Sequence, residues 1–123
     1  LNESKIPFIT AVGNESDNLA STPYYPAMYS QVERYNIFTG VKNLKNVIAV
    51  GALLTNGTRW VGSNYGSGLV WKKGVNVLSA LPGNKMGKMT GTSQAAALAT
   101  HDLLLKICEG RRDVIKVQSG RSR

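Results

Sequence analysis

The stretch KMTGTSQAAALAT, Lys88–Thr100, decides the fold, because it sets Gly-Thr-Ser directly before a run of alanines. Serine and threonine are favoured where a helix begins, since their side-chain oxygens accept hydrogen bonds from backbone N–H groups that the first turn leaves unpaired. The residues from Ser93 to Glu109 are good helix formers, and Gly110 offers a natural stop. We therefore expect a helix over residues 93–109.

Small and apolar residues dominate the first half of this expected helix. Ala96, Ala99, Leu103 and Ile107 recur at spacings of three and four residues, which places them in one continuous stripe. The pattern predicts a helix that is buried inside a domain.

Ser93 has two interpretations at this position. As a capping residue it would be purely structural. As a reactive residue it would profit from Gly91, which permits a close backbone approach, and from the helix N-terminus, which directs partial positive charge towards it. As a reactive residue, Ser93 would therefore be well placed to form an anionic reaction intermediate.

Three apolar runs predict strands that are covered on both faces, because their hydrophobic residues are continuous rather than alternating. They are Ile6–Val12, Asn46–Leu54 and Val75–Leu81. Residues 21–45 are rich in aromatic and turn residues and predict a loop with a short helical piece, and residues 82–90 read mostly as turn. The class is α/β with a mainly parallel sheet, in a single domain or part of one.

Composition limits the possible partners. The chain has 123 residues, and no apolar run approaches the roughly 20 residues that cross a bilayer, so no membrane span is expected. Fifteen Lys and Arg against seven Asp and Glu give +8, which attracts anionic partners. No nucleic-acid motif accompanies the charge, so nucleic-acid binding is disfavoured. The basic residues 111–123 predict a frayed tail.

Metal and disulfide chemistry have few candidate residues. Cys108 is the single cysteine and His101 the single histidine, so neither an internal disulfide nor a zinc site of His and Cys can form from this chain. We expect no metal and no cofactor in it. Because the chain opens with Leu1 and shows no leader pattern, we expect a piece of a longer polypeptide or one that has lost a leader.

Five motifs in one order resemble the C-terminal half of a subtilisin-like serine peptidase. They are ITAVGNES, YYPA, VIAVGALL, SNYGS and GVNVLSALPGNKMGKMTGTSQAAA, which together cover about residues 6–105. The resemblance implies a partial subtilisin-like fold whose buried central helix begins at the nucleophile. It further implies that residues 1–123 are the C-terminal portion of the catalytic domain, with Ser93 as the nucleophile and Asn14 as an oxyanion donor.

The chemistry of these two assignments is consistent with the residue types. A serine hydroxyl attacks a peptide carbonyl only when a base takes its proton and preset donors meet the oxygen that becomes negative. Asn14, in a Gly-Asn turn after a buried strand, can offer a fixed amide N–H beside the backbone N–H of Ser93. The alternative for Asn14 is a simple turn residue.

Substrate preference follows from the same resemblance. In the family, residues matching Ala11, Val12 and Gly13 wall the pocket for the side chain before the scissile bond, and the residue matching Tyr24 lies at its base. A tyrosine fills volume that glycine would leave open, so we expect small or medium side chains to be preferred. The alternative for Tyr24 is a packed loop aromatic.

The general base is absent from this sequence. His101 lies eight residues after Ser93 on the expected helix, about 12 Å along its axis, whereas a base must come within about 3 Å. Asp17, Asp102 and Asp113 do not stand in the family's aspartate motif. The resemblance implies that Asp and His come from an N-terminal portion of the same protease or from a second chain. By the resemblance, that portion also carries the first strands of the sheet, so we expect one flank of the sheet to be open in this chain. Any calcium ion would lie in that portion. The resemblance also suggests a secreted protein with a polypeptide substrate.

Departures and alternatives remain open. Ala97 and His101 stand where the family usually has proline and glycine, and Lys72-Lys73-Gly74 replaces Ala-Pro-Gly. GTSQA approximates the G-x-S-x-G elbow of α/β-hydrolases. That fold needs an acid and then a histidine after the serine, and no histidine follows His101 in this sequence. A non-enzymatic alternative is an inactive, peptidase-derived module that binds polypeptides.

Overall fold

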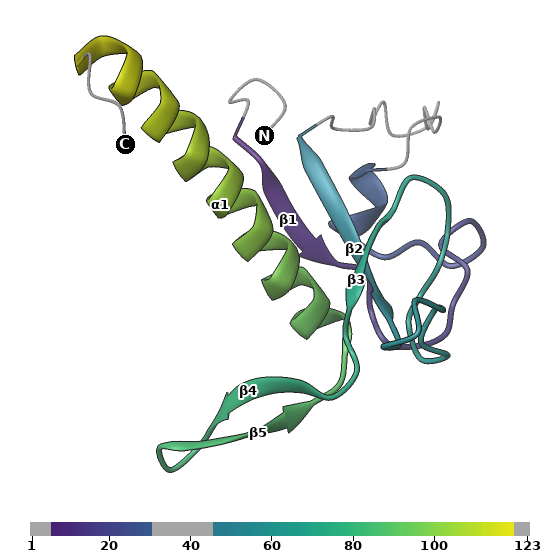
Figure 1. Cartoon of the computed structure of the whole chain (residues 1–123). Helices are drawn as coiled ribbons and strands as arrows, with labels where there is room; N and C mark the ends of the chain where they lie inside the picture. The colour runs from purple at the N-terminus through teal and green to yellow at the C-terminus, as the bar shows by residue number, and fades with distance from the viewer. Residues whose placement is uncertain (1–5, 31–45, 120–123) are drawn as a thin grey trace.

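The computed structural model describes residues 6–30 and 46–119, with side chains up to residue 110. Figure 1 shows a short sheet with one long helix along it and a hairpin that projects from the end where the helix begins. In chain order the elements are β1 (Phe8–Ala11), the 3-10 helix η1 (Ala27–Ser30), β2 (Val47–Leu53), β3 (Val70–Lys73), β4 (Val77–Leu81), β5 (Lys85–Met89) and α1 (Thr92–Ser119). No helix in this described part is long and apolar enough to span a bilayer.

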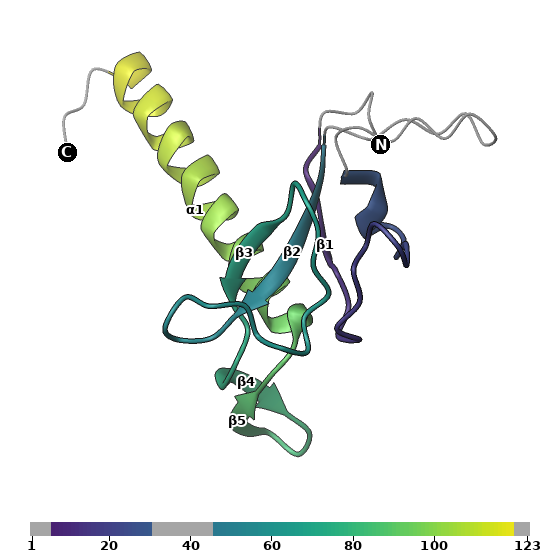
Figure 2. The same cartoon turned by 90° about the vertical axis from the view of Figure 1, so that its right-hand side faces the viewer.

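The main sheet has the order β1-β2-β3, and both pairings are parallel, as predicted. Val50 of β2 is opposite Ala11 on one side and Val70 on the other. β2 lies between β1 and β3 (Figure 2). It is buried along most of its length, which agrees with its continuous apolar run.

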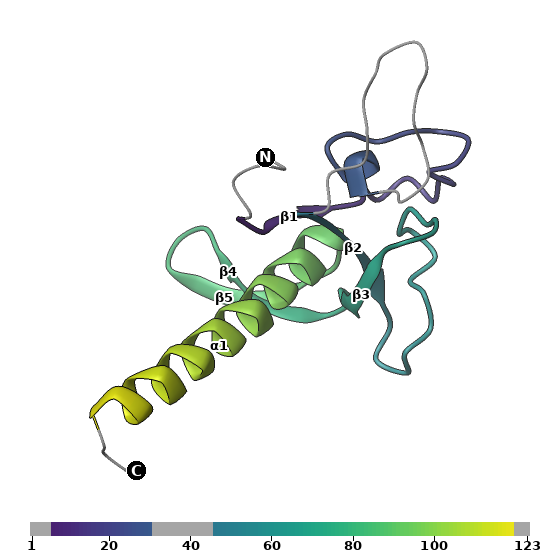
Figure 3. The ribbon, with the colours of Figure 1, turned by 90° about the horizontal axis from the view of Figure 1, so that it is seen from above.

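The two faces of the sheet are covered by different elements (Figure 3). On one face, Ala95 and Ala99 of α1 pack against Val50 and Ala52 of β2. Their small side chains allow the helix to approach the strands closely. On the other face, η1 and its preceding loop build a second core of five buried residues, namely Val12, Leu19, Ala27, Met28 and Ala49.

Helix α1 differs from the expected one at both ends. It begins at Thr92, one residue before Ser93, and continues past Gly110 to Ser119. Gly110 does not stop the helix because it does not adopt the left-handed backbone that a glycine stop uses. The predicted burial holds for the first half only, since Ile107 is 41% exposed where α1 runs beyond the sheet (Figure 1). Of the residues 111–123 expected as a frayed tail, 111–119 continue the helix, and 120–123 lie outside the described residues.

The third expected strand was assigned to the wrong place. β4 does not join the main sheet; it pairs antiparallel with β5, from Val77 opposite Met89 to Leu81 opposite Lys85. Residues 82–90 are therefore largely strand rather than turn. Gly83 and Asn84 adopt positive φ angles of 77° and 56°, which let the chain reverse at once. β3 was missed because its two lysines break the apolar pattern.

The base of the hairpin is held by two hydrogen bonds. The N–H of Gly91 donates to the carbonyl of Gly74 at 2.8 Å, and the N–H of Asn76 donates to the hydroxyl of Thr90 at 3.0 Å. The chain thus leaves β3, makes the hairpin and returns to the same point before α1 begins. This arrangement sets the position of Ser93 relative to the sheet.

Candidate active site

The C-terminal end of β1 and the N-terminal end of α1 meet through Asn14 and Thr92. The side-chain oxygen of Asn14 accepts hydrogen bonds from the backbone N–H of Thr92 at 2.8 Å and from its hydroxyl at 2.9 Å. The two residues are 78 positions apart in the chain. Asn14 and the residue that precedes Ser93 are therefore neighbours in space.

Thr92 also binds the residue before Asn14. Its hydroxyl oxygen accepts a hydrogen bond from the backbone N–H of Gly13 at 3.2 Å, and the residue is 1% exposed. The sequence offered Ser93 as a possible cap, whereas the N–H of Thr92 at the helix start is capped here by the carboxamide of Asn14. The role of the Thr92 hydroxyl as a link was missed, because a contact between residues this far apart leaves no local signal.

Ser93 lies exposed in the first turn of α1. Neither its hydroxyl nor its backbone N–H has a hydrogen-bond partner among residues 6–30 and 46–110. First-turn N–H groups have no acceptor within a helix and carry its partial positive charge. The side-chain oxygen of Asn14 is engaged by Thr92, which leaves the NH₂ of Asn14 available as a donor at this helix end. Such a group of donors can stabilise a negatively charged oxygen.

The β1 loop (residues 12–17) carries Asn14 and has an unusual backbone. Gly13 has a φ of 104° and Ser16 a φ of 63°. A side chain on Gly13 would collide with the amide nitrogen of Asn64 and with the carboxylate of Glu15, both 2.5 Å from the position of its Cβ. The loop therefore requires glycine at this position.

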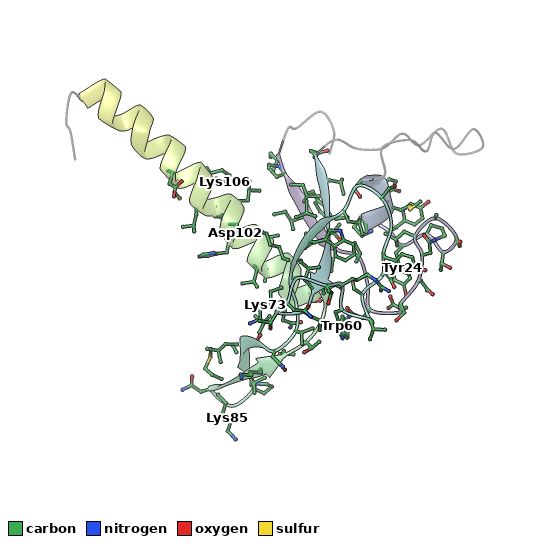
Figure 4. All side chains as sticks on the ribbon, turned by 45° about the vertical axis from the view of Figure 1, so that its right-hand side comes forward. Tyr24, Trp60, Lys73, Lys85, Asp102 and Lys106 are labelled. Carbon is green, nitrogen blue, oxygen red and sulfur yellow. The ribbon has the colours of Figure 1, made fainter. Side chains whose placement is uncertain are left out.

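The residues expected to wall a substrate pocket gather at this end of β1. Ala11 ends the strand and is half-buried, and Gly13 follows in the β1 loop. The side chain of Val12 is fully buried in the core rather than exposed. Tyr24 packs against that core, on the side away from α1 (Figure 4). A hydrogen bond with the carboxylate of Glu15 raises the pKa of Tyr24.

His101 lies apart from Ser93 on the exposed surface of α1, as expected for a helix-face residue. Its side chain is 66% exposed, and its Nδ1 lies 3.6 Å from Oδ1 of Asp102. Asp102 binds Lys72 of β3, and this hydrogen bond and the lysine charge lower the pKa of Asp102. The pair of Asp102 and Lys72 thus joins α1 to the sheet.

Among the described residues, no three His, Cys, Asp or Glu side chains are placed to hold a metal ion.

Comparisons with known proteins agree on one family. The sequence model of the subtilase family matches residues 1–107. Subtilisin-like protease 10 of Arthroderma otae is 33% identical over 70 residues, which cover 54% of this chain and 18% of that protein.

Solved structures show the same fold. The self-cleaved protease domain of PatA superposes with a TM-score of 0.62 at 22% identity, over 98% of this chain and 38% of that one. The PatG macrocyclase in complex with peptide gives a TM-score of 0.64 at 24% identity, over 98% of this chain and 31% of that one.

The chain therefore covers between 18% and 38% of the length of these relatives. The parallel sheet and the long helix of the described residues form part of a subtilisin-like α/β domain. On the family match, the chain belongs to the subtilase family of serine peptidases and is a fragment of its peptidase domain.

Proposed function

We propose that this chain is the nucleophile-bearing portion of a serine endopeptidase, which hydrolyses peptide bonds through an acyl-enzyme on Ser93. The observation that carries the proposal is the pair of hydrogen bonds from Thr92 to Asn14, at 2.8 and 2.9 Å. They orient the carboxamide of Asn14 at the amide end of α1. In the reaction, the hydroxyl of Ser93 attacks the carbonyl carbon, and the NH₂ of Asn14 and the N–H of Ser93 donate to the carbonyl oxygen as it becomes negative.

The base that accepts the serine proton comes from outside this chain. His101 contacts Asp102 on the surface of α1, which supports the view that it serves packing rather than catalysis. We therefore assign the catalytic His and Asp to an N-terminal portion of the same protease or to a second chain. The short share of each relative that this chain covers supports this assignment.

The docking surface for that portion is the free side of β1 together with α1. Among the described strands, β1 pairs only with β2. Beside it lies an apolar groove of about 350 Å³ between the start of β1 and the middle of α1, lined by Ile9, Leu103, Leu104 and Ile107 among others. A surface of this kind is costly to leave in water. We assign it to the portion of the peptidase domain that carries Asp and His.

The substrate is a polypeptide whose side chain before the scissile bond lies in a pocket walled by Ala11, Val12 and Gly13, with Tyr24 at its base. Because Val12 is buried, it would shape this wall from beneath rather than touch the substrate. Any calcium ion belongs to the portion outside this chain, and we place the protein outside the cell, as a secreted peptidase.

A serine-directed fluorophosphonate tests the assignment of Ser93. The chain isolated with its completing portion should become labelled at Ser93, whereas the chain alone should not. Ser93→Ala should abolish labelling, and Ser21→Ala, which alters an exposed loop serine, should leave it unchanged. An assembly that forms but stays unlabelled would contradict the peptidase and support the alternative function, a catalytically inactive module that binds polypeptides.

A further inference from the structure

Asn64, in the connection between β2 and β3, is fully buried and uses its whole hydrogen-bonding capacity on one segment. Its side-chain oxygen accepts from the backbone N–H groups of Glu15 at 3.0 Å and Asp17 at 2.8 Å. Its NH₂ donates to the carbonyl of Val12 and to the carboxylate of Glu15, both at 2.9 Å. A carboxamide has two donor hydrogens and two acceptor lone pairs, so every one is used.

These contacts lie on both sides of Asn14. Val12 precedes it, and Glu15 and Asp17 follow it. The backbone N–H of Asn64 adds a further bond, to the carbonyl of Gly13 at 3.0 Å. One buried residue thus holds the β1 loop before and after Asn14, while Thr92 holds the carboxamide itself.

The β1 loop needs such support because its backbone is not the one its sequence prefers. Ser16 has a φ of 63°, in the left-handed region that costs a residue with a side chain about 1–2 kcal/mol. Strained backbone of this kind persists where the surrounding bonds over-determine it. In this loop the side chain of Asn64 supplies four of those bonds.

We infer that Asn64 is a positioning residue for the proposed peptidase reaction: it fixes the β1 loop in the path that brings the carboxamide of Asn14 to the amide end of α1. The inference rests on the proposed function. Asn64 acts through Asn14, so its loss affects the step in which the oxyanion forms more than the binding of substrate.

The test replaces Asn64 with Asp in the assembled peptidase. Asn64→Asp keeps the shape and both acceptor bonds, but it puts a carboxylate where the amide donated to Val12 and Glu15. We expect kcat to fall on the order of 10- to 100-fold, with KM changed by less than about twofold. The ratio of variant to wild-type kcat should rise as the pH is lowered from about 8 to about 6, because two adjacent carboxylates share a proton more readily at lower pH.

A matched control and a rescue separate positioning from general damage. Asn56→Asp makes the same change at an exposed turn, where kcat should stay at the wild-type value. Adding Glu15→Gln to Asn64→Asp should recover much of the lost kcat, since the new amide at position 15 can donate to the carboxylate at position 64. If Asn64→Asp does not assemble, the double variant is compared with Glu15→Gln alone, and a lower kcat at the same KM supports the inference.

Other results overturn it. An Asn64→Asp enzyme that keeps kcat within twofold of wild type across this pH range, or that changes KM alone, shows a purely structural asparagine. Equal kcat in the double variant and in Glu15→Gln has the same meaning where the single variant does not assemble. A wild-type assembly without activity is a different failure, seen before any substitution: it removes the proposed function, and this inference falls with it.

Discussion

Asn14 accepts two hydrogen bonds from a single residue, Thr92, one from the backbone N–H at 2.8 Å and one from the hydroxyl at 2.9 Å. The hydroxyl also accepts from the N–H of Gly13. The end of β1 and the start of α1 are thus joined at one buried residue. The orientation of the Asn14 amide depends on a neighbour of the proposed nucleophile.

Thr92→Val should lower kcat of the assembled peptidase about tenfold, because the carboxamide loses one of its two restraints and the N–H of Gly13 loses its acceptor. Thr92→Ser keeps the hydroxyl and should stay close to wild type. Steady-state kinetics on a peptide substrate measure both variants. Equal kcat values for the two would show that the hydroxyl does not orient Asn14.

Asn14→Ala should lower kcat about 100- to 1000-fold, the loss known for a subtilisin without such a donor. KM should change little, since the donor meets the oxygen mainly in the transition state. The cap of α1 is lost as well, so the free energy of unfolding should fall by about 1 kcal/mol. Kinetics and urea unfolding separate the two effects, and an unchanged kcat would remove Asn14 from the oxyanion site.

Tyr24→Gly should broaden the cleavage profile towards aromatic side chains, because it opens volume at the base of the proposed pocket. Tyr24→Phe keeps that volume and removes only the hydrogen bond with Glu15, so its profile should match wild type. Cleavage of a peptide library, read by mass spectrometry, compares the three proteins. Identical profiles for Tyr24→Gly and wild type would refute the pocket assignment.

Two glycines should respond in opposite directions to alanine. At Gly74 a Cβ would lie 2.5 Å from Cβ of Ala52 and 2.8 Å from the carbonyl of Gly91, so Gly74→Ala should destabilise the fold by about 1–3 kcal/mol. Gly110 lies inside α1 with nothing within 4 Å of its notional Cβ, so Gly110→Ala should stabilise by about 0.5–1 kcal/mol. Urea unfolding of the assembled protein measures both, and changes of the same sign would contradict this placement.

Acid should weaken the contact between α1 and β3. Lys72 lowers the pKa of Asp102 in the folded state, so this contact stabilises the fold above the unfolded pKa of about 4 and is lost as pH falls through the lower folded value. The difference in unfolding free energy between wild type and Asp102→Asn should therefore shrink below about pH 4. A difference that stays constant down to about pH 2 would show that Asp102 is not stabilised by this pair.

Local sequence patterns predicted the elements whose signal is local. The apolar run of β2 and the helix after Gly91 were expected at nearly their observed positions, and the parallel sheet followed from unbroken hydrophobic residues. β4 has a similar apolar run, yet it lies in an exposed hairpin. Burial depends on which strand becomes its partner, and five residues cannot encode that choice.

Asn14 could be selected in the sequence because it follows an apolar run in a Gly-Asn turn. Asn64 could not be selected for its contacts, since its partners lie about 50 positions away and a buried asparagine resembles any loop asparagine in sequence. The same limit applies to the hydroxyl of Thr92. Residues that act through distant backbone groups become visible only when the chain is folded.

The hydrogen bond between Gly91 and Gly74 joins the two ends of residues 75–90, so this segment is a closed loop whose ends are fixed in position. The entropic cost of closing such a loop grows slowly, by about 0.6 kcal/mol for each doubling of its length. Insertions, deletions or grafted peptides at its outer end, where Figure 4 labels Lys85, should leave the register of α1 unaltered. Natural variation and engineering can therefore act on this hairpin without displacing the serine that follows it.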